Sequence, residues 1–549
     1  MPRTVAFLVS LFFCGALLSQ ENKYWIRFTD KNNNSFSVDN PQQFLSPLSI
    51  ERRTKQNILV DETDLPITES YINSIFPYID TLVHRLKWTN MVVADIDSLP
   101  MLDSILQFSF VDTIGKIEEN PNREAYEQNK FEDVYPVNQE ILIDTNTIYG
   151  IAYRQTNMLN VDLLHQLGWR GQGVLMSSFD NGFLNVHTIA GFDSVRPRIL
   201  NTYDFVNHQT DVYHGGSHGT NTFSDIAGNI PRKFLGTAPD ASFLLIQTED
   251  NTREWVMEEY NWQAGAEYAD SIGAKIFTTS LGYTTFNYSI GSHSYADLDG
   301  HTTVITRAAN LAAGKGILVL NSAGNEGDKS WHYISAPADG DSVIAIGAVD
   351  SGEAVTNFSG RGPNSAGRIK PDICAQGTKS AIILDYGGIG YSGGTSFSCP
   401  IMAGAFASLW SAFPDKTARE IYTAVLVSSD NFWTPDNHHG YGIPNFYNAY
   451  LLLKTNYNEN ILRLSDDVVV YPNPFSTELN LSFFSGADKT HRIDIFDLKG
   501  SKVYSNEIFL RDKTFELVKF TGFEKLPAGE YILMLNGQKN FTHRIMKLK

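Results

Sequence analysis

The sequence has few cysteines, a deficit of basic residues and only one long apolar run. Three of its 549 residues are cysteine, so its stability must come from a packed core and not from a disulfide framework. Its 43 Lys and Arg face 61 Asp and Glu, giving a formal net charge of −18. Binding phosphates requires a basic surface, which argues against a nucleic-acid partner. The remaining composition, 42% hydrophobic and 12% aromatic, is that of a globular protein with several domains.

The long apolar run lies at the N-terminus, over Val5–Leu18, after a short start that contains Arg3. Fourteen residues are too few to cross a bilayer comfortably, but they suit a signal peptide. We therefore predict a signal peptide over residues 1–20 and export of the remainder. Cys14 leaves lipidation as an alternative, although the two bulky Phe residues before it argue against a lipoprotein site.

Removal of such a signal leaves two cysteines, Cys374 and Cys399. Two thiols allow a single disulfide, and they are also compatible with two small buried side chains. The second interpretation is favoured, but the sequence leaves both open.

Composition divides the chain into successive regions. Residues 21–118 mix short strand-like runs with helical stretches, which suits a small α+β unit. Residues 119–148 are polar and predict an exposed linker. Residues 149–455 form the largest region, and a short linker over 456–463 separates it from a last region over 464–549.

Strand–helix alternation marks the largest region as α/β. Short apolar runs without strict alternation are typical of strands buried on both faces of a parallel sheet. Chemistry is then expected at the carboxyl ends of the strands. The predicted strands are Val174–Phe179, Ser242–Ile246, Ile276–Thr279, Ile317–Leu320 and Val343–Val349, and the main helices are Trp255–Ser271 and Thr302–Ala313.

The flanking regions follow other patterns. Residues 464–549 alternate with period two and carry turn signals, and about seven short strands predict a C-terminal β-sandwich. In the N-terminal region the predicted strands are Lys23–Phe28, Met91–Ile96 and Gln107–Val111, and a helix is predicted over Ile67–Ile75.

A candidate nucleophile lies in the stretch Gly393–Pro400, where a Gly-rich turn leads into an apolar helical run. Proline is well tolerated in the first turn of a helix, so we expect the helix to begin near Pro400. Ser396 then lies at a helix N-terminus, where backbone N–H groups and the helix dipole stabilise negative charge. The alternative is that Ser396 only caps the helix.

A serine hydroxyl needs a base, and the base needs a third group that fixes its tautomer. His218 lies in a Gly-rich segment that leads into helical sequence, and Asp180 ends the first buried strand beside a glycine turn. Taken singly, a capping His and a turn-forming Asp are the simpler interpretations.

Together these residues resemble the subtilisin-like serine proteases. The order Asp, His, Ser is that of the family, and Ser217–Thr220 and Gly394–Pro400 are similar to its histidine and serine signatures. The resemblance implies a three-layer α/β domain with a mainly parallel central sheet. It also implies an endopeptidase that uses Asp180, His218 and Ser396 as a catalytic triad and forms an acyl-enzyme.

Three further blocks match the same family. Gly236–Ala241 resembles the segment leading into a central strand, and Ser280, Leu281 and Gly282 resemble the stretch whose backbone binds substrate. Ala323–Gly327 resembles the block with the oxyanion asparagine, which implies that role for Asn325. Glu326 would then lie near the rim of the pocket for the residue before the cleaved bond, a weak indication of basic substrates.

The sequence departs from the family in three places. Asn181 and Asn221 replace residues common beside the Asp and His, and neither is in the triad. The segment Gly228–Gly236 is short and lacks carboxylates, which puts the family's calcium site there in doubt. The other acidic cluster, Asp297–Gly300, is a metal loop or an ordinary turn. We therefore predict no metal site and no cofactor, with calcium left open.

The flanking regions resemble parts of enzymes exported by the type IX secretion system. Residues 21–118, with Phe44–Arg53, resemble an inhibitory propeptide, and 119–148 would be the processing region. Val468–Phe475, Leu526–Ile532 and closing basic residues resemble a type IX sorting domain. The alternatives are a permanent accessory domain at the N-terminus and a carbohydrate-binding or adhesive sandwich at the C-terminus.

The sequence therefore predicts a secreted or surface-bound serine endopeptidase that reaches its destination through the periplasm of a Gram-negative bacterium. Expected partners are protein or peptide substrates and the type IX secretion machinery, with no nucleic acid, and the expected state is a monomer. The alternative is a non-catalytic surface adhesin on a degenerate protease fold. The family resemblance leaves the physiological substrate open.

Overall fold

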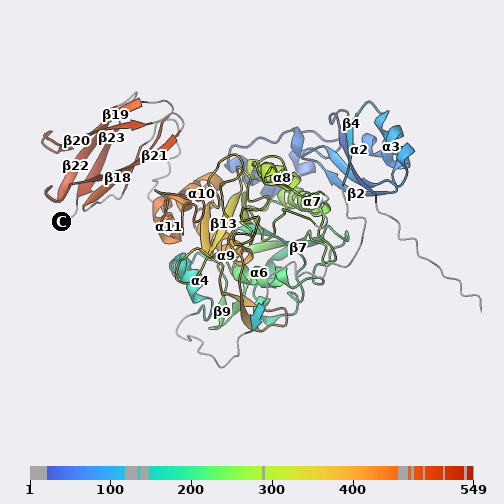
Figure 1. Ribbon diagram of the computed structural model, residues 1–549, viewed down its shortest axis with the longest axis horizontal. Helices are drawn as coiled ribbons and strands as arrows, with labels where there is room; N and C mark the ends of the chain where they lie inside the picture. Colours follow the sequence, from blue (N-terminus) through green and yellow to red (C-terminus); the bar gives the residue numbers. More distant parts are fainter. Residues whose placement is uncertain are drawn as a thin grey trace, which may run out of the picture.

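The computed structural model comprises an N-terminal unit, a large central unit and a C-terminal unit (Figure 1). It describes residues 22–117, 134–136, 148–286, 291–454, 468–471, 475, 477–485, 489–510, 514–536 and 541–547. The predicted signal peptide and the predicted linker over 456–463 lie outside these residues.

The central unit is built on a seven-stranded sheet in which every strand pairing is parallel. This confirms the α/β prediction, and the five predicted strands agree with the observed ones to within two residues at each end. The strand order is β14 (Ile373–Gln376), β13 (Ile344–Val349), β12 (Leu318–Ser322), β11 (Ile276–Thr279), β6 (Leu175–Asp180), β10 (Ser242–Gln247) and β7 (Ile199–Asp204).

Helices cover both faces of this sheet, and alternate strand residues enter two different cores. Phe243 and Leu245 of β10 join one core, whereas Leu244 and Ile246 join the other. The first core holds α4 (Tyr153–Met158), α5 (Val161–Gln166), α6 (His218–Ala227), α9 (Thr395–Ala412), α10 (Ala418–Val427) and α11 (Phe446–Lys454). The second holds α7 (Met257–Ile272) and α8 (Val304–Gly314).

The N-terminal unit is a four-stranded antiparallel sheet with its own apolar core. The predicted strand over Gln107–Val111 was wrong, because Gln107 caps the C-terminus of a helix and the strand begins only at Val111. The strand order is β2 (Thr81–Leu86), β3 (Met91–Asp95), β1 (Lys23–Phe28) and β4 (Val111–Lys116), and the helices are α1 (Pro47–Lys55), α2 (Glu69–Ile75) and α3 (Leu99–Leu106).

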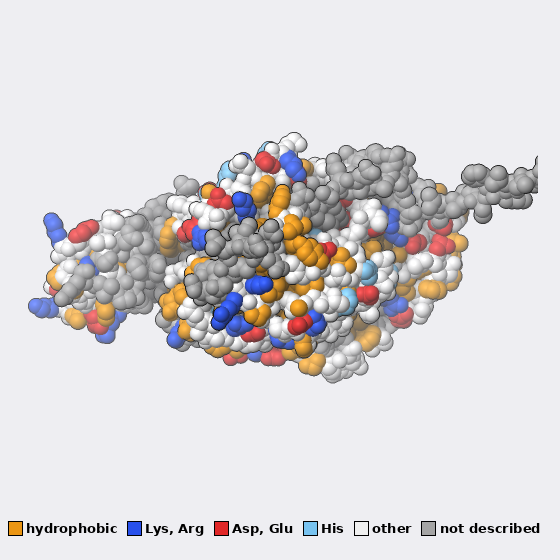
Figure 2. Space-filling view, turned by 90° about the horizontal axis from the view of Figure 1, so that it is seen from below, with side chains coloured by type: hydrophobic (Ala, Val, Ile, Leu, Met, Phe, Trp, Pro, Cys, Tyr) orange, Lys and Arg blue, Asp and Glu red, His pale blue; other side chains and the backbone are white. Residues whose placement is uncertain are grey.

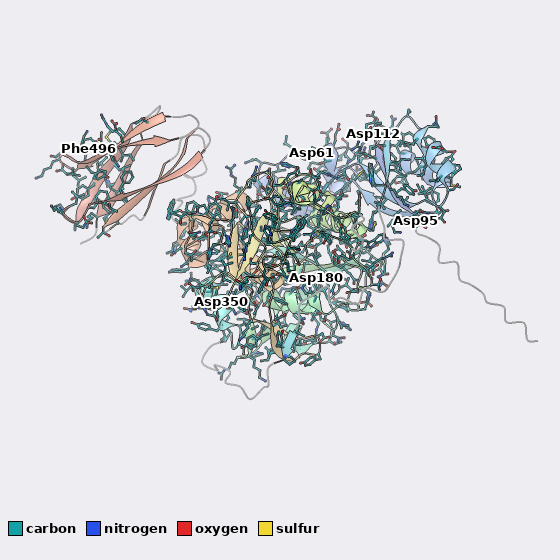
Figure 3. All side chains as sticks on the ribbon, viewed as in Figure 1. Asp61, Asp95, Asp112, Asp180, Asp350 and Phe496 are labelled. Carbon is teal, nitrogen blue, oxygen red and sulfur yellow. The ribbon has the colours of Figure 1, made fainter. Side chains whose placement is uncertain are left out.

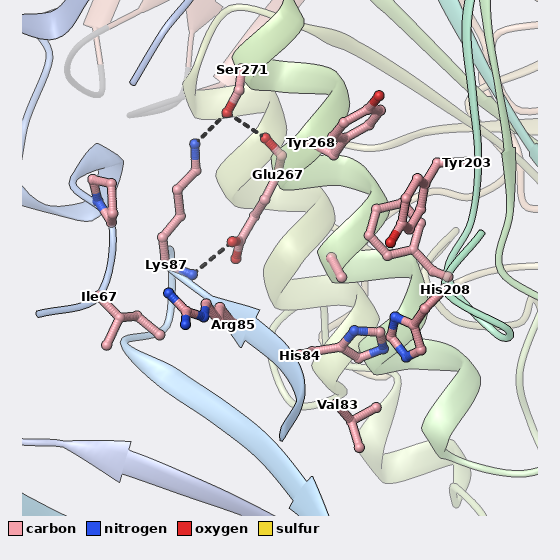
Figure 4. A pocket seen from close by; sticks show the side chains of 13 residues that line it. Ile67, Val83, His84, Arg85, Lys87, Tyr203, His208, Glu267, Tyr268 and Ser271 are labelled. Carbon is pink, nitrogen blue, oxygen red and sulfur yellow. Dashed lines mark hydrogen bonds between the residues drawn. The ribbon is translucent and has the colours of Figure 1, made fainter. Parts of the chain in front are cut away.

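The N-terminal unit lies against α7 of the central unit, and a cavity of about 460 Å³ opens where they meet. His84 and Lys87 line the cavity from one side, and His208 and Glu267 line it from the other (Figure 4). The backbone N–H of Lys87 donates to the Glu267 carboxylate at 2.7 Å, and the Lys87 ammonium donates to Ser271 at 2.6 Å. Burial raises the pKa of Glu267 to about 7.

Among the described residues of the predicted linker over 119–148, residues 134–136 form a strand that the sequence did not indicate. β5 (Val134–Pro136) pairs antiparallel with β16 (Ile389–Ser392), which also pairs with β15 (Ser380–Ile383). The segment is short and exposed, so no hydrophobic pattern revealed it; the free edge of β16 supplies its hydrogen bonds. A smaller hairpin joins β8 (Asn229–Ile230) to β9 (Phe234–Leu235).

The C-terminal unit consists of two antiparallel sheets, as predicted for a β-sandwich. Its core contains Leu479, Ile493 and Leu533 from different strands. One sheet has the order β17 (Val468–Tyr471), β18 (Glu478–Ser485) and β21 (Thr514–Thr521). The other has the order β20 (Lys502–Leu510), β19 (Lys489–Asp497), β22 (Gly529–Asn536) and β23 (Phe541–Lys547).

Figure 2 shows Lys and Arg side chains interspersed with Asp and Glu over the face it presents. Across the described residues, no helix combines the length and the apolar character that spanning a membrane requires.

Candidate active site

Asp180 is the last residue of β6, in the interior of the central unit (Figure 3). Its Oδ1 accepts a hydrogen bond from Nδ1 of His218 at 2.7 Å and another from the backbone N–H of Asn181 at 2.8 Å. Asp180 is 1% exposed and His218 is 4% exposed. The structure thus brings together an Asp and a His that lie 38 residues apart in the sequence.

His218 is the first residue of α6, and its neighbour must be a glycine. A Cβ on Gly219 would lie 2.8 Å from Cβ of Asp180 and 2.2 Å from the carbonyl oxygen of Gly182. Only a residue without a side chain lets the helix start this close to the end of β6. Because Nδ1 donates to Asp180, the neutral imidazole carries its lone pair on Nε2, the atom suited to accept a proton.

Ser396 is the second residue of α9, so it lies at a helix N-terminus as the sequence indicated. The prediction that the helix begins near Pro400 was wrong, because α9 starts at Thr395 and contains this proline. Pro400 has no N–H to bond the carbonyl four residues earlier, which is that of Ser396. Instead, the Ser280 hydroxyl donates to the Ser396 carbonyl oxygen at 2.7 Å.

The side chain of His218 lies beside the start of α9. Its ring centroid is 6.1 Å from that of Phe397, the residue after Ser396. Ser396 Oγ lies 3.4 Å from the carbonyl oxygen of Ser280, within hydrogen-bonding distance. Four segments therefore meet at one place. They are the end of β6 with Asp180, the start of α6 with His218, the residue after β11, Ser280, and the start of α9 with Ser396.

Asn325 lies next to the same helix start. Its Oδ1 accepts hydrogen bonds from the backbone N–H of Thr395 at 2.8 Å and from the Thr395 hydroxyl at 2.9 Å. The Thr395 hydroxyl also lies 3.1 Å from the backbone N–H of Gly324. These contacts hold the oxygen end of the amide against α9, which fixes the direction of the Nδ2 donor at its other end.

The stretch Ser280–Gly282 follows β11 and is held in place by β12. The carbonyl oxygen of Leu281 accepts hydrogen bonds from the side chains of Asn321 at 2.9 Å and Ser322 at 3.2 Å. A Cβ on Gly282 would lie 2.1 Å from Oγ of Ser335, so a side chain at this position would collide with it. The backbone of this stretch is therefore rigidly placed beside Ser396.

Three residues that assist this arrangement were not anticipated in these roles. Thr395 orients Asn325, Ser280 replaces the missing helix hydrogen bond of Ser396, and Thr222 Oγ1 donates to Oδ2 of Asp180 at 2.9 Å. The spacing of Thr222, four residues after His218, was the available signal, because such residues share a helix face.

The acidic residues considered for calcium serve local turns. Asp297 accepts hydrogen bonds from the backbone and hydroxyl of Ser294, and Asp299 accepts them from His301 and Thr302. Burial raises the pKa of Asp299, but these bonds outweigh it, and they lower the pKa of both carboxyls. The segment over 228–236 contains the β8–β9 hairpin and no carboxylate, so it lacks the ligands that calcium prefers.

The structure also shows a cluster of three glutamates that the sequence analysis did not predict. Glu249, Glu254 and Glu258 bring carboxylate oxygens within 4.8 Å of one another. Glu258 accepts hydrogen bonds from the backbone N–H groups of Asp250 and Trp255, so it already holds the turn before α7. Glu249 accepts one from the Tyr283 hydroxyl.

Cys374 and Cys399 are both free and buried, and no disulfide joins them. Burial raises the pKa of both thiols, that of Cys399 to about 12.

Glu326 forms an ion pair with Lys329 at 2.9 Å. The negative charge of Glu326, which suggested a preference for basic substrates, is therefore partly compensated by Lys329.

Comparison with known proteins assigns a family model to each unit. Residues 171–442 match the subtilase family, residues 23–132 match the peptidase S8 propeptide domain of Bacteroidota, and residues 469–548 match the secretion system C-terminal sorting domain. These matches confirm the resemblance inferred from the motifs and the sorting route inferred from the C-terminal region. They identify a secreted or cell-surface protein of a Gram-negative bacterium.

Curated relatives match the central unit at modest identity. Subtilisin E of Bacillus subtilis (strain 168) is 30% identical over 279 residues, which are 50% of this chain and 63% of that protein. Subtilisin of Bacillus pumilus is 29% identical over 303 residues, which are 54% of this chain and 96% of that protein. Thermophilic serine proteinase of Bacillus sp. (strain AK1) is 28% identical over 265 residues, which are 47% of this chain and 59% of that protein. The chain thus spans less than two thirds of the length of the first of these relatives.

Proposed function

Because residues 171–442 match the subtilase family, we propose that this protein is a secreted serine endopeptidase that cleaves protein or peptide substrates through an acyl-enzyme. The observation that carries the proposal is the hydrogen bond between Nδ1 of His218 and the buried carboxylate of Asp180, beside Ser396. A base whose tautomer is fixed next to a serine at a helix N-terminus is the arrangement that nucleophilic catalysis needs.

In this mechanism Ser396 attacks the carbonyl carbon of the scissile bond while His218 takes its proton at Nε2. His218 then returns the proton to the leaving amine, which departs and leaves Ser396 acylated. Water repeats the sequence with His218 as the base and releases the acid product. Asp180 continues to accept the hydrogen bond from Nδ1 and stabilises the imidazolium form of His218.

The negative charge of the tetrahedral intermediate falls on the former carbonyl oxygen. The Nδ2 group of Asn325 and the backbone N–H of Ser396 would hold this oxyanion, with the N-terminus of α9 adding a favourable dipole. Thr395 supports the first of these roles because it holds the oxygen end of the Asn325 amide. The backbone of Ser280, Leu281 and Gly282 would bind the extended substrate chain, and no metal or cofactor takes part in this scheme.

The N-terminal unit matches a propeptide domain, so we propose that it restrains the protease during export. The C-terminal unit would engage the type IX secretion machinery. Loss of a triad member would have favoured the alternative, an adhesin on a degenerate protease fold, and Asp180, His218 and Ser396 are all retained.

A fluorophosphonate probe tests the proposal because it labels only an activated serine. We expect the matured wild-type protein to be labelled and to cleave casein, and Ser396→Ala to lose both properties while remaining folded by circular dichroism. Ser398→Ala is the matched control, since Ser398 lies in the same helix and donates to the Thr395 carbonyl. Labelling that persists in Ser396→Ala would place the nucleophile elsewhere, and a folded wild-type protein that resists the probe would favour the adhesin.

A further inference from the structure

Two side chains of α6 contact opposite oxygens of the Asp180 carboxylate. His218 and Thr222 are four residues apart, so they lie one above the other on the same helix face. His218 Nδ1 bonds Oδ1 at 2.7 Å, and the Thr222 hydroxyl bonds Oδ2 at 2.9 Å. Thr222 is 2% exposed, so water does not compete for this contact.

The Thr222 hydroxyl has one proton and two nearby acceptors. Its oxygen lies 2.9 Å from Asp180 Oδ2 and 3.2 Å from the carbonyl oxygen of Gly219. A hydrogen bond to an ionised acceptor is shorter and about twice as strong as one to a neutral carbonyl. The hydroxyl therefore donates its proton in a hydrogen bond to the Asp180 carboxylate and not to the Gly219 carbonyl. The β-branched side chain has few rotamers in a helix, which keeps the hydroxyl in this direction.

We propose that Thr222 is a positioning residue for catalysis, which together with His218 fixes the plane of the Asp180 carboxylate. This inference rests on the proposed function. Without Thr222 the carboxylate can rotate about its Cβ–Cγ bond. Oδ1 then faces Nδ1 in only a fraction of the molecules. His218 consequently spends less time in the tautomer and orientation that accept the Ser396 proton.

The effect should appear in the chemical step and not in substrate binding. Thr222 contacts Asp180 within the domain, and the segment assigned to substrate, Ser280–Gly282, is held by other residues. Loss of the hydroxyl should therefore lower kcat by roughly tenfold, the consequence of about one charge-assisted hydrogen bond. KM should stay within about twofold of the wild-type value.

The test compares Thr222→Val, Thr222→Ala and Thr222→Ser on a chromogenic peptide, after maturation by added wild-type enzyme. Active sites are counted by fluorophosphonate titration, so any loss of folded protein does not enter kcat. Thr222→Val and Thr222→Ala should show the lowered kcat, and Thr222→Ser, which keeps the hydroxyl, should recover most of it. Thr220→Val is the matched control, because Thr220 lies on the same helix and donates to Leu184 instead.

A double variant separates positioning from a general structural role. If Thr222 acts through Asp180, adding Thr222→Val to Asp180→Asn should change kcat by less than about twofold. Full kcat in both Thr222→Val and Thr222→Ala would overturn the inference, as would a Thr222→Ser variant as slow as Thr222→Val. An inert wild-type protein would overturn the proposed function and the inference with it, whereas an active one with unaffected variants overturns the inference alone.

Discussion

The guanidinium of Arg53 donates to the carboxylate of Asp270 at 2.9 Å, and both side chains are at least 99% buried. Arg53 belongs to α1 of the propeptide domain, and Asp270 belongs to α7 of the protease domain. Arg52 binds the other oxygen of Asp270, and Arg53 also reaches Asp64 at 2.8 Å. The two domains of the precursor thus share a buried ion-pair network.

Removing one member of this network should destabilise the precursor strongly. Burial raises the pKa of Asp270, but Arg52 and Arg53 outweigh it and hold the pKa below its usual value. Asp270→Asn leaves two buried guanidinium groups short of a partner, so we expect a loss of about 3–5 kcal/mol in the free energy of unfolding. Urea titration of the Ser396→Ala precursor measures this loss.

Asp112→Asn is the control for that experiment, because Asp112 pairs with Arg27 at the surface, where both side chains are nearly half exposed. Its effect should stay below about 1 kcal/mol. The contribution of Asp270 to the free energy of unfolding is present above the pKa that its carboxyl has in the unfolded chain. It is lost as pH falls through the lower pKa of the folded state. Equal effects of the two substitutions would contradict a stabilising role for the buried network.

His84 should make the precursor sensitive to mild acid. It is buried between the two domains with Nε2 2.7 Å from Oδ1 of Asn261, and burial lowers its pKa to about 4. Because an unfolded His titrates near 6.5, its contribution is present above that pH and is lost as pH falls from about 6.5 to 4. The loss should reach about 2 kcal/mol at pH 5.

Urea titrations of the Ser396→Ala precursor at pH 7 and pH 5 measure this dependence. His84→Gln should reduce the difference between the two pH values, since glutamine does not titrate. His438→Gln, at an exposed position, should leave the difference unchanged. A pH dependence that survives His84→Gln in full would assign the sensitivity to other groups.

Asn325→Ala should slow turnover by roughly two to three orders of magnitude, the magnitude known from removing such a donor in subtilisin. The hydrogen bond strengthens only as charge develops on the oxyanion, so KM should change little. Steady-state kinetics on a chromogenic peptide, with titrated active sites, measures both constants. A change confined to KM would make Asn325 a substrate-binding residue.

Maturation should depend on Ser396 and should cut the chain before β5. Ser396→Ala is expected to accumulate as precursor unless another protease cleaves it. Val134–Pro136 pairs with β16 of the protease domain, so these residues should remain with the mature enzyme. N-terminal sequencing of the wild-type product locates the cut, and a mature N-terminus beyond Pro136 would contradict this expectation.

Deletion of residues 464–549 should block secretion and leave a folded precursor in the periplasm. The C-terminal sandwich has its own core, so its removal should not open the protease domain. Immunoblots of periplasm and culture medium, with the full-length chain as control, measure the distribution. Undiminished secretion of the truncated chain would overturn the sorting role, and loss of attachment to a surface or polymer would favour an adhesive module.

The sequence by itself determined the fold class and the candidate triad. Short apolar runs such as Ile276–Thr279 form strands of the central sheet, because strands of a parallel sheet are buried on both faces and therefore lack an alternating pattern. Asp180, His218 and Ser396 were recognisable since each lies at a strand end or helix start, where short glycine-containing motifs carry the local geometry.

Only the tertiary structure decided the contacts between residues far apart in the chain. The start of α9 before Pro400 depends on Ser280, which lies 116 residues away and satisfies the carbonyl that the proline leaves without its helical partner. β5 forms where β16 offers it an edge, and its three residues are too few to show a strand pattern in the sequence. Local propensity depends on neighbouring residues, whereas these contacts join residues far apart in the chain. The fold brings the distant hydrogen-bonding groups together and buries the Arg53–Asp270 ion pair.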